Sequence, residues 1–114
     1  MLKFFFAPNT CAVASHIALE EAGAVYETVR VDFRSNQQRS PDYLAINPKG
    51  RVPALATERG ILTETPAILA FIEQSHPAAQ LAPLNAPFEF ARAQAFNSYL
   101  CSTVHVAHAH RVRG

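Results

Sequence analysis

The sequence predicts an α/β fold in which a βαβ unit and a ββα unit share one four-stranded mixed sheet, followed by a helical segment. Three observations support this fold class. A short β-prone run gives way to helical spacing, an alternating pattern then returns, and two further β-prone runs precede a second helical pattern. Because 49% of the 114 residues are hydrophobic, the chain can bury one ordinary core.

The first unit covers residues 2–33. The β-prone run Leu2–Phe6 stops at a proline, and from Thr10 onward apolar residues recur at helical intervals. Thr10 suits the N-cap of this helix, and Gly23 suits its C-terminal stop. Residues 25–33 alternate apolar and polar side chains and predict a second strand, which the helical crossover makes parallel to the first.

The connection between the units is predicted to be mostly irregular. Residues 34–40 are polar and show no period, which predicts a loop. Pro41 can start only a brief helix before the Asn-Pro-Lys-Gly stretch at 47–50 ends it.

The second unit is a hairpin followed by a helix. Residues 52–57 and 61–63, separated by a turn, predict two short strands. Thr65-Pro66 opens the next helix and His76-Pro77 closes it. This element order is the thioredoxin-like architecture.

The predicted domains are a thioredoxin-like domain at 1–80, a proline-spaced linker at 81–87, and a segment at 88–114 that starts an all-helical second domain. The N-terminal apolar run is too short for a signal peptide or a membrane span. A net charge of +1, with neither sign clustered, argues against nucleic-acid binding. We therefore expect a cytoplasmic protein whose partners are small molecules or proteins, with neither nucleic acid nor membrane among them.

Cys11 is a candidate catalytic thiol because it lies in the first turn of the first predicted helix. Unpaired N–H groups and the positive end of the helix dipole favour a thiolate there. The alternative is a small buried cysteine that only packs against a strand. Cys11 is followed by Ala-Val-Ala, so the second cysteine of a CxxC motif is absent. Cys101 is not expected to pair with Cys11 in a reducing compartment.

Two further segments suit the ends of a peptide ligand. Pro53 cannot donate to a sheet, so it must lie at an edge or in a special geometry such as a cis bond. A cis bond would leave the amide and carbonyl of Val52 free to pair with an extended peptide; alternatively, Pro53 simply starts a strand. At the next helix start, Thr65 can seat a carboxylate and Glu64 an ammonium group, although Thr65 could equally be only an N-cap.

Histidines recur near the end of the chain. His105 and His108 share a helical face at i, i+3, a spacing found in metal sites. Since no acidic or cysteine ligand follows nearby, we expect a solvated helix surface and no metal.

Four segments together resemble the bacterial beta class of glutathione transferases. They are Cys11 after the first strand, the helix sequence Ala-Ser-His-Ile-Ala-Leu at 14–19, the stretch Asn-Pro-Lys-Gly-Arg-Val-Pro-Ala-Leu at 47–55, and Leu-Thr-Glu-Thr-Pro-Ala-Ile at 62–68. The resemblance covers residues 2 to about 105 in the same order. It implies that the chain stops inside the first helix of the family's second domain.

The resemblance also implies a ligand and a set of roles. Glutathione, γ-Glu-Cys-Gly, would be the co-substrate, with its main chain on Val52-Pro53 and its γ-glutamyl end at Glu64 and Thr65. Cys11 would lie beside the glutathione sulfur, and His105 would reach it from the second domain. Arg34 stands near the position of a loop lysine that the family places at the glycine carboxylate. The family is dimeric, so a homodimer is expected.

Three functions remain open from the sequence. The first is an enzyme whose bound glutathione thiolate attacks an electrophilic carbon or a disulfide. The second is a truncated module that binds glutathione without turnover. The third is a thioredoxin-fold interaction protein in which Cys11 is structural.

Overall fold

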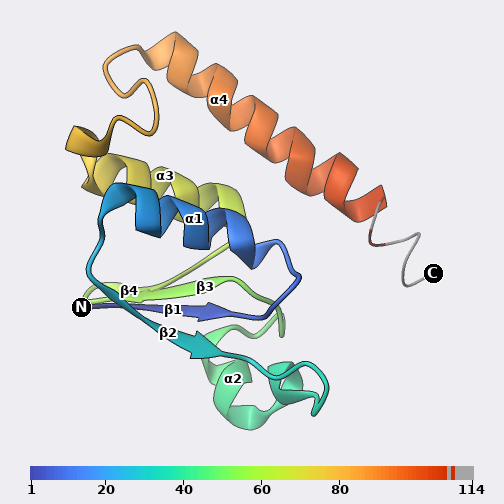
Figure 1. Cartoon of the computed structure of the whole chain (residues 1–114). Coiled ribbons are helices and arrows are strands. Elements are labelled where there is room, and N and C mark those ends of the chain that lie inside the picture. The colour runs from blue at the N-terminus through green and yellow to red at the C-terminus, as the bar shows by residue number, and fades with distance from the viewer. Residues whose placement is uncertain (108, 110–114) are drawn as a thin grey trace.

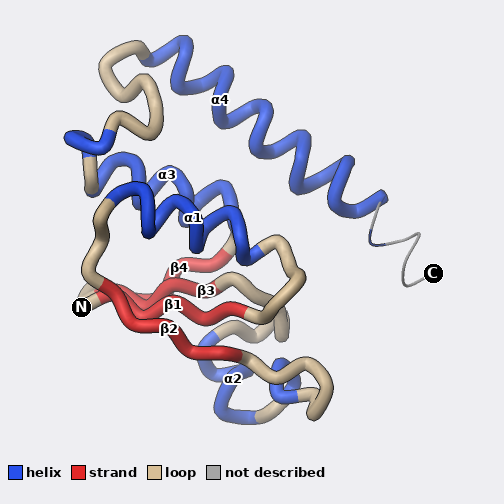
Figure 2. Tube along the Cα trace, in the orientation of Figure 1, coloured by secondary structure: helices blue, strands red, loops and turns tan. Residues whose placement is uncertain are grey.

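The computed structural model describes residues 1–107 and 109 and confirms the α/β arrangement (Figures 1 and 2). The four strands lie in the order β2-β1-β3-β4. β1 pairs in parallel with β2 and antiparallel with β3, and β3 pairs antiparallel with β4. The strands are β1 (Leu2–Phe6), β2 (Tyr26–Arg30), β3 (Ala54–Thr57) and β4 (Gly60–Thr63).

The helices cover both faces of this sheet. Figure 2 shows α1 (Ala12–Ala22) and α3 (Thr65–Ser75) side by side over one face, with α2 (Pro41–Ile46) on the opposite side. A 3₁₀ turn at Gln37–Arg39 leads into α2. Beyond α3 lies α4 (Pro87–Tyr99), which continues into a π-helical turn at Leu100–Val104.

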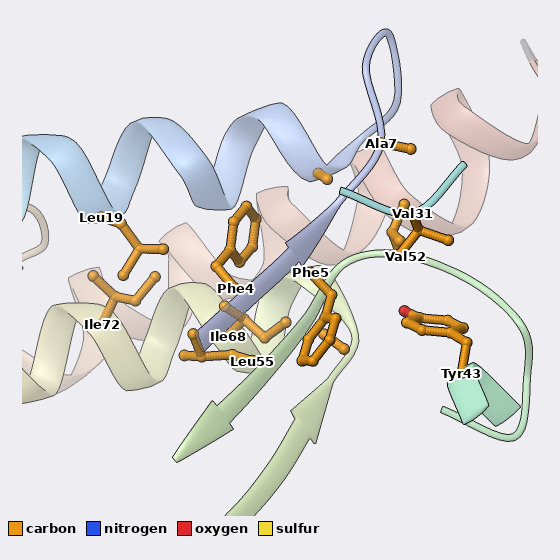
Figure 3. Close-up of a cluster of buried hydrophobic side chains, with 12 residues drawn as sticks. Phe4, Phe5, Ala7, Leu19, Val31, Tyr43, Val52, Leu55, Ile68 and Ile72 are labelled. Carbon is orange, nitrogen blue, oxygen red and sulfur yellow. The ribbon is translucent and has the colours of Figure 1, made fainter. Parts of the chain in front are cut away.

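The core lies between β1, β3 and the pair of helices α1 and α3. Successive strand residues point to opposite faces, so Phe4 faces the helices whereas Phe5 faces α2. The Phe5 ring meets Tyr43 of α2 edge-on, with ring centroids 5.9 Å apart. Fully buried large apolar side chains of the helix-facing core, drawn in Figure 3, are Phe4, Leu19, Leu55, Ile68 and Ile72. Each such side chain contributes about 2 kcal/mol to folding.

β2 is shorter than the sequence pattern predicts. The strand ends at Arg30, and the next amide, of Val31, still donates to Phe6 O at 2.7 Å. The chain then turns, because the Asp32 carboxylate accepts from the Arg34 amide at 3.0 Å in a local turn that competes with strand pairing. The alternation of apolar and polar residues in the sequence therefore continues beyond Arg30, where the strand ends.

The predicted ends of α1 are confirmed at one terminus and wrong by one residue at the other. Gly23 follows the helix in the left-handed conformation, at φ 67°, as predicted. At the start, Cys11 rather than Thr10 holds the cap position. The Thr10 hydroxyl still supports the turn, since it accepts from the Ala12 amide at 3.3 Å and donates to Ala7 O at 2.6 Å.

Pro53 does not lie at an edge of the sheet. It precedes β3, which is flanked by β1 and β4 and is therefore an interior strand. The Val52-Pro53 peptide bond is cis, which is the second geometry that the sequence allowed. The edge interpretation was wrong because the proline stands outside the paired residues of the strand.

Residues 77–86 connect α3 to α4. They begin with a 3₁₀ turn at Pro77–Ala79, and α4 starts at Pro87, one residue before the predicted position. The boundaries at 80 and 87 stay predictions. Within the described residues, none of the helices combines the length and apolar character that a membrane span requires.

Candidate functional site

Cys11 lies at the junction between β1 and α1. Its half-buried thiol donates to the carbonyl oxygen of Val52, with 3.7 Å between sulfur and oxygen. The positive end of the α1 dipole lies beside this sulfur, although the amides of Ala12, Val13 and Ala14 already donate to Thr10 Oγ1, Thr10 O and Cys11 O. Folding thus places the candidate nucleophile against the backbone that the sequence singled out as a peptide-binding element.

A network of polar contacts fixes the backbone before Val52. The carbonyl oxygen of Arg51 accepts from the Tyr43 hydroxyl at 2.6 Å and from the Asn47 amide nitrogen at 2.8 Å. Asn47 and Tyr43 are both buried. Burial raises the pKa of Tyr43 to about 12, so its hydroxyl stays a donor at neutral pH. Two buried donors on one carbonyl therefore hold the peptide group that precedes Val52.

Gly50 lets the same loop turn closely against the segment before α2. It has a φ of 65°, and a Cβ atom there would lie 3.0 Å from the carbonyl oxygen of Gln38. A side chain at this position would meet both strain and backbone contact. Residues 47–53, which we call the Val52 loop, are thus anchored at several points.

Glu64 and Thr65 lie where β4 turns into α3. The structure corrects the N-cap interpretation of Thr65: Glu64 holds the cap position, and Thr65 is the first helical residue and is buried. Glu64 has a φ of 76°, which is rare for a residue other than glycine. Pro66 has no N–H and the Ile68 amide donates to Glu64 O at 3.0 Å, so the amides of Thr65 and Ala67 are the ones in this first turn that suit a carboxylate.

Lys49 is a residue of this site that sequence reasoning missed. Its ammonium nitrogen lies 2.6 Å from Glu64 Oε2 and 3.4 Å from the Thr63 hydroxyl. In the sequence, Lys49 stands out only as part of a stretch that ends a helix. A signal was present, because this stretch leads directly into Val52, but pairing with Glu64 depends on the fold.

Cys101 is the second residue that sequence reasoning missed. It lies in the π-helical turn after α4 and is half-buried. Burial raises the pKa of its thiol, and the nearby charges of Cys11 and Glu64 raise it further. The turn at Leu100–Val104 therefore passes close to the Cys11 end of the site, although each cysteine was judged alone in the sequence.

His105 follows this turn. It follows Cys101 at i, i+4, so the two side chains share a face of the helix. Its side chain is exposed. His108 lies outside the described residues, as does His110. Among residues 1–107 and 109, no three His, Cys, Asp or Glu side chains are grouped so as to bind a metal ion.

Arg34 lies in the turn after β2 and is exposed. Because β1 and β2 are parallel, the turn that follows β2 and the loop that carries Cys11 lie at the same end of the sheet. Arg34 thus lies at the same end of the sheet as Cys11, on the rim of the site. The contacts within the site are those of Cys11 with Val52 and of Lys49 with Glu64.

Comparison with known proteins identifies the family. The model of the glutathione S-transferase N-terminal domain matches residues 1–74. Glutathione S-transferase GstA of Escherichia coli O157:H7 is 38% identical over 107 residues, which is 91% of this chain and 53% of the relative. Maleylacetoacetate isomerase of Pseudomonas aeruginosa is 31% identical over 95% of this chain and 52% of the relative.

Solved structures give the same result. A glutathione transferase homologue from Sulfitobacter, crystallised with bound glutathione, superposes with a TM-score of 0.94 at 52% identity, covering 100% of this chain and 55% of that one. BphK, a bacterial glutathione S-transferase solved as a ternary complex, gives 0.85 at 38% identity, over 94% and 55%. The chain thus spans about half the length of the relatives it matches. From this match of residues 1–74 and from these relatives, the chain belongs to the glutathione S-transferase family.

Proposed function

We propose that this chain binds glutathione and belongs to an enzyme that uses the glutathione thiolate as its nucleophile. The observation that carries the proposal is the contact between the Cys11 thiol and the Val52 carbonyl. A γ-Glu-Cys-Gly peptide whose main chain pairs with Val52 would bring its own sulfur to Cys11. Bound glutathione in the Sulfitobacter homologue supports this assignment.

The γ-glutamyl end of the ligand has a complementary seat. Its ammonium group would pair with Glu64, and its carboxylate would accept from the Thr65 hydroxyl and from the amides of Thr65 and Ala67. Arg34 is proposed to attract the glycine carboxylate from the rim. These three groups match a peptide that is charged at both ends.

The reaction proposed is substitution by sulfur. Glutathione loses its thiol proton to solvent, and the thiolate attacks an electrophilic carbon, forming a C–S bond as the leaving group departs with its electron pair. With a disulfide substrate, the thiolate attacks one sulfur and the other departs as a thiolate. Detoxification of small electrophiles or disulfides is the corresponding role.

Cys11 can take part in two ways. It can donate a hydrogen bond to the glutathione thiolate and favour conjugation. Alternatively, its own thiolate attacks oxidised glutathione, forms a mixed disulfide and releases one glutathione thiolate. His105 is proposed to approach the sulfur from the helical segment.

We further propose a cytoplasmic homodimer. Two cysteines without a disulfide fit a reducing compartment. Exposed large apolar residues on α1 and along α4 and its extension offer surface for burial against further protein. These residues are Val13, Ile17, Phe88, Phe96, Tyr99, Val104 and Val106.

The test is protection of Cys11 from alkylation. S-Methylglutathione, which has no free thiol, is added to the purified chain before iodoacetamide, and labelling is followed by mass spectrometry. We expect the ligand to slow labelling of Cys11 in the wild-type chain but not in E64Q. Labelling of Cys11 at an unchanged rate would contradict the proposal and favour a thioredoxin-fold interaction module.

A further inference from the structure

Glu64, the proposed partner of the ligand's ammonium group, already holds a cation of the chain itself. The Lys49 ammonium lies 2.6 Å from Glu64 Oε2. It also lies 3.4 Å from the Thr63 hydroxyl. An arriving γ-glutamyl ammonium group therefore meets an occupied carboxylate rather than a free one.

The backbone of Lys49 is fixed while its side chain is not. The Lys49 amide donates to Asn47 Oδ1 at 3.2 Å, and the buried Asn47 is itself bonded to Arg51 O. The side chain of Lys49 is 51% exposed and that of Glu64 is 63% exposed. Exposed ion pairs of this kind are weak and exchange readily. The ammonium group can thus leave Glu64 without disturbing the Val52 loop.

We propose that Lys49 is a ligand-binding residue that releases Glu64 to the ligand's ammonium group and pairs instead with the ligand's α-carboxylate. This inference rests on the proposed function. The amino and carboxyl groups of the γ-glutamyl end share one carbon atom, so a carboxylate at the start of α3 lies beside the ammonium group at Glu64. Lys49, already in contact with Glu64, is within a side-chain movement of that carboxylate.

The exchange makes the site selective for end groups that carry both charges. A zwitterion replaces one ion pair, Lys49 with Glu64, by two. A ligand with an ammonium group alone displaces Lys49 and gives it no new partner. A ligand with a carboxylate alone leaves the original pair intact and can still use the positive charge of Lys49.

The experiment compares three ligands by isothermal titration calorimetry. They are S-methylglutathione, its glutaryl analogue without the α-amino group, and its 4-aminobutyryl analogue without the α-carboxylate. The variants are K49Q and K49R. K3Q is the matched control, because Lys3 is an exposed lysine of β1 whose strand register places it opposite Ala56 and not beside Glu64.

We expect K49Q to weaken S-methylglutathione and the glutaryl analogue about two- to fivefold, as expected for an exposed ion pair. The 4-aminobutyryl analogue should bind K49Q at least as tightly as it binds wild type, because K49Q lacks the ammonium group that competes for Glu64. K49R should restore the wild-type order, and K3Q should match wild type.

Other outcomes overturn the inference. If K49Q binds S-methylglutathione more tightly, Lys49 is only a competitor; if K49Q changes all three affinities equally, its role is structural. Equal thermal midpoints for K49Q and wild type exclude misfolding as the cause. If the wild-type chain binds none of the ligands, the proposed function fails as well. If the wild-type chain binds them normally and K49Q has the same affinities as wild type, this inference alone is overturned.

Discussion

The sulfur atom of Cys11 lies 3.7 Å from the carbonyl oxygen of Val52, although 41 positions separate the two residues in the chain. The contact joins the start of α1 to the loop that enters β3. A cysteine-containing peptide has its sulfur only a few bonds from its main chain, so one such ligand can meet both groups. The pairing explains why a thiol and a backbone segment form one site.

Replacement of Cys11 should separate the two proposed roles of its thiol. C11S keeps a hydrogen-bond donor but cannot form a disulfide, so we expect it to retain conjugation and lose exchange with oxidised glutathione. C11A should lose both. Turnover of an aryl halide and of a mixed disulfide measures the two activities. Equal losses in C11S and C11A for conjugation would contradict a donor role.

Replacement of Glu64 by glycine should have opposite effects on the stability of the chain and on ligand binding. Its φ of 76° costs about 1–3 kcal/mol for a residue other than glycine, so E64G should unfold at an equal or higher temperature. The same variant removes the carboxylate and should bind S-methylglutathione at least about tenfold more weakly. E64Q, which keeps the side-chain shape, should show the binding loss without the gain in stability. Thermal melts and calorimetry provide the two readouts.

Gly50 should be intolerant of a side chain. G50A adds a Cβ atom 3.0 Å from Gln38 O at a φ of 65°, so we expect about 1–3 kcal/mol of destabilisation together with weaker ligand binding. G23A is the control, because Gly23 has a similar φ of 67° but no heavy atom within 4 Å of the added Cβ. It should lose about 1 kcal/mol and bind normally. Urea unfolding and calorimetry distinguish the two variants, and normal binding by G50A would exclude a role for the Val52 loop.

Tyr43 should make the chain sensitive to alkaline pH. Burial raises its pKa from 10 to about 12 in the folded chain, so the folded state retains a proton that the unfolded state loses. The free energy of unfolding should therefore fall as the pH rises from about 10 to about 12. Y43F should be about 1 kcal/mol less stable at neutral pH, because the bond to Arg51 O is lost, and should show a shallower alkaline fall.

The control for Tyr43 is Y26F. The pKa of Tyr26 is also raised to about 12, first by burial and then by its hydrogen bond to Glu20. Urea unfolding at a series of pH values should show a shallower fall for Y26F as well. Only Y43F should also weaken binding of S-methylglutathione, since of these two tyrosines it is Tyr43 that donates to the Val52 loop, at Arg51 O. An alkaline profile of Y43F identical to wild type would contradict the assignment.

Local chemistry accounts for most of what the sequence predicted of the fold. Gly23 ends α1, Pro41 and Pro66 open helices, and the hairpin turn separates two short strands, all through effects of nearby residues. The error at the end of β2 is also local in origin, since a side chain bonded to an amide two residues away decides it. The strand β2 ended early because the Asp32 side chain formed its own turn.

The site was predictable only in part, because some of its contacts join residues that are far apart in the sequence. Cys11, Val52 and Glu64 each lie beside a helix start or a proline, which are signals that a sequence displays. Cys101 displays no such signal, and Lys49, although it follows Pro48, gives no sign of its partner, because both roles depend on Glu64 and Cys11 being brought close by the fold. When two residues 15 or more positions apart come close in the fold, no local sequence pattern shows it.

The π-helical turn at Leu100–Val104 affects how the described residues beyond it are rotated about the helix axis. Such a turn accommodates one additional residue, and each residue of an α-helix advances the chain by about 100° around the axis. Loss of one residue between Cys101 and His105 would therefore change their spacing from i, i+4 to i, i+3 and turn His105 relative to Cys101 about the helix axis.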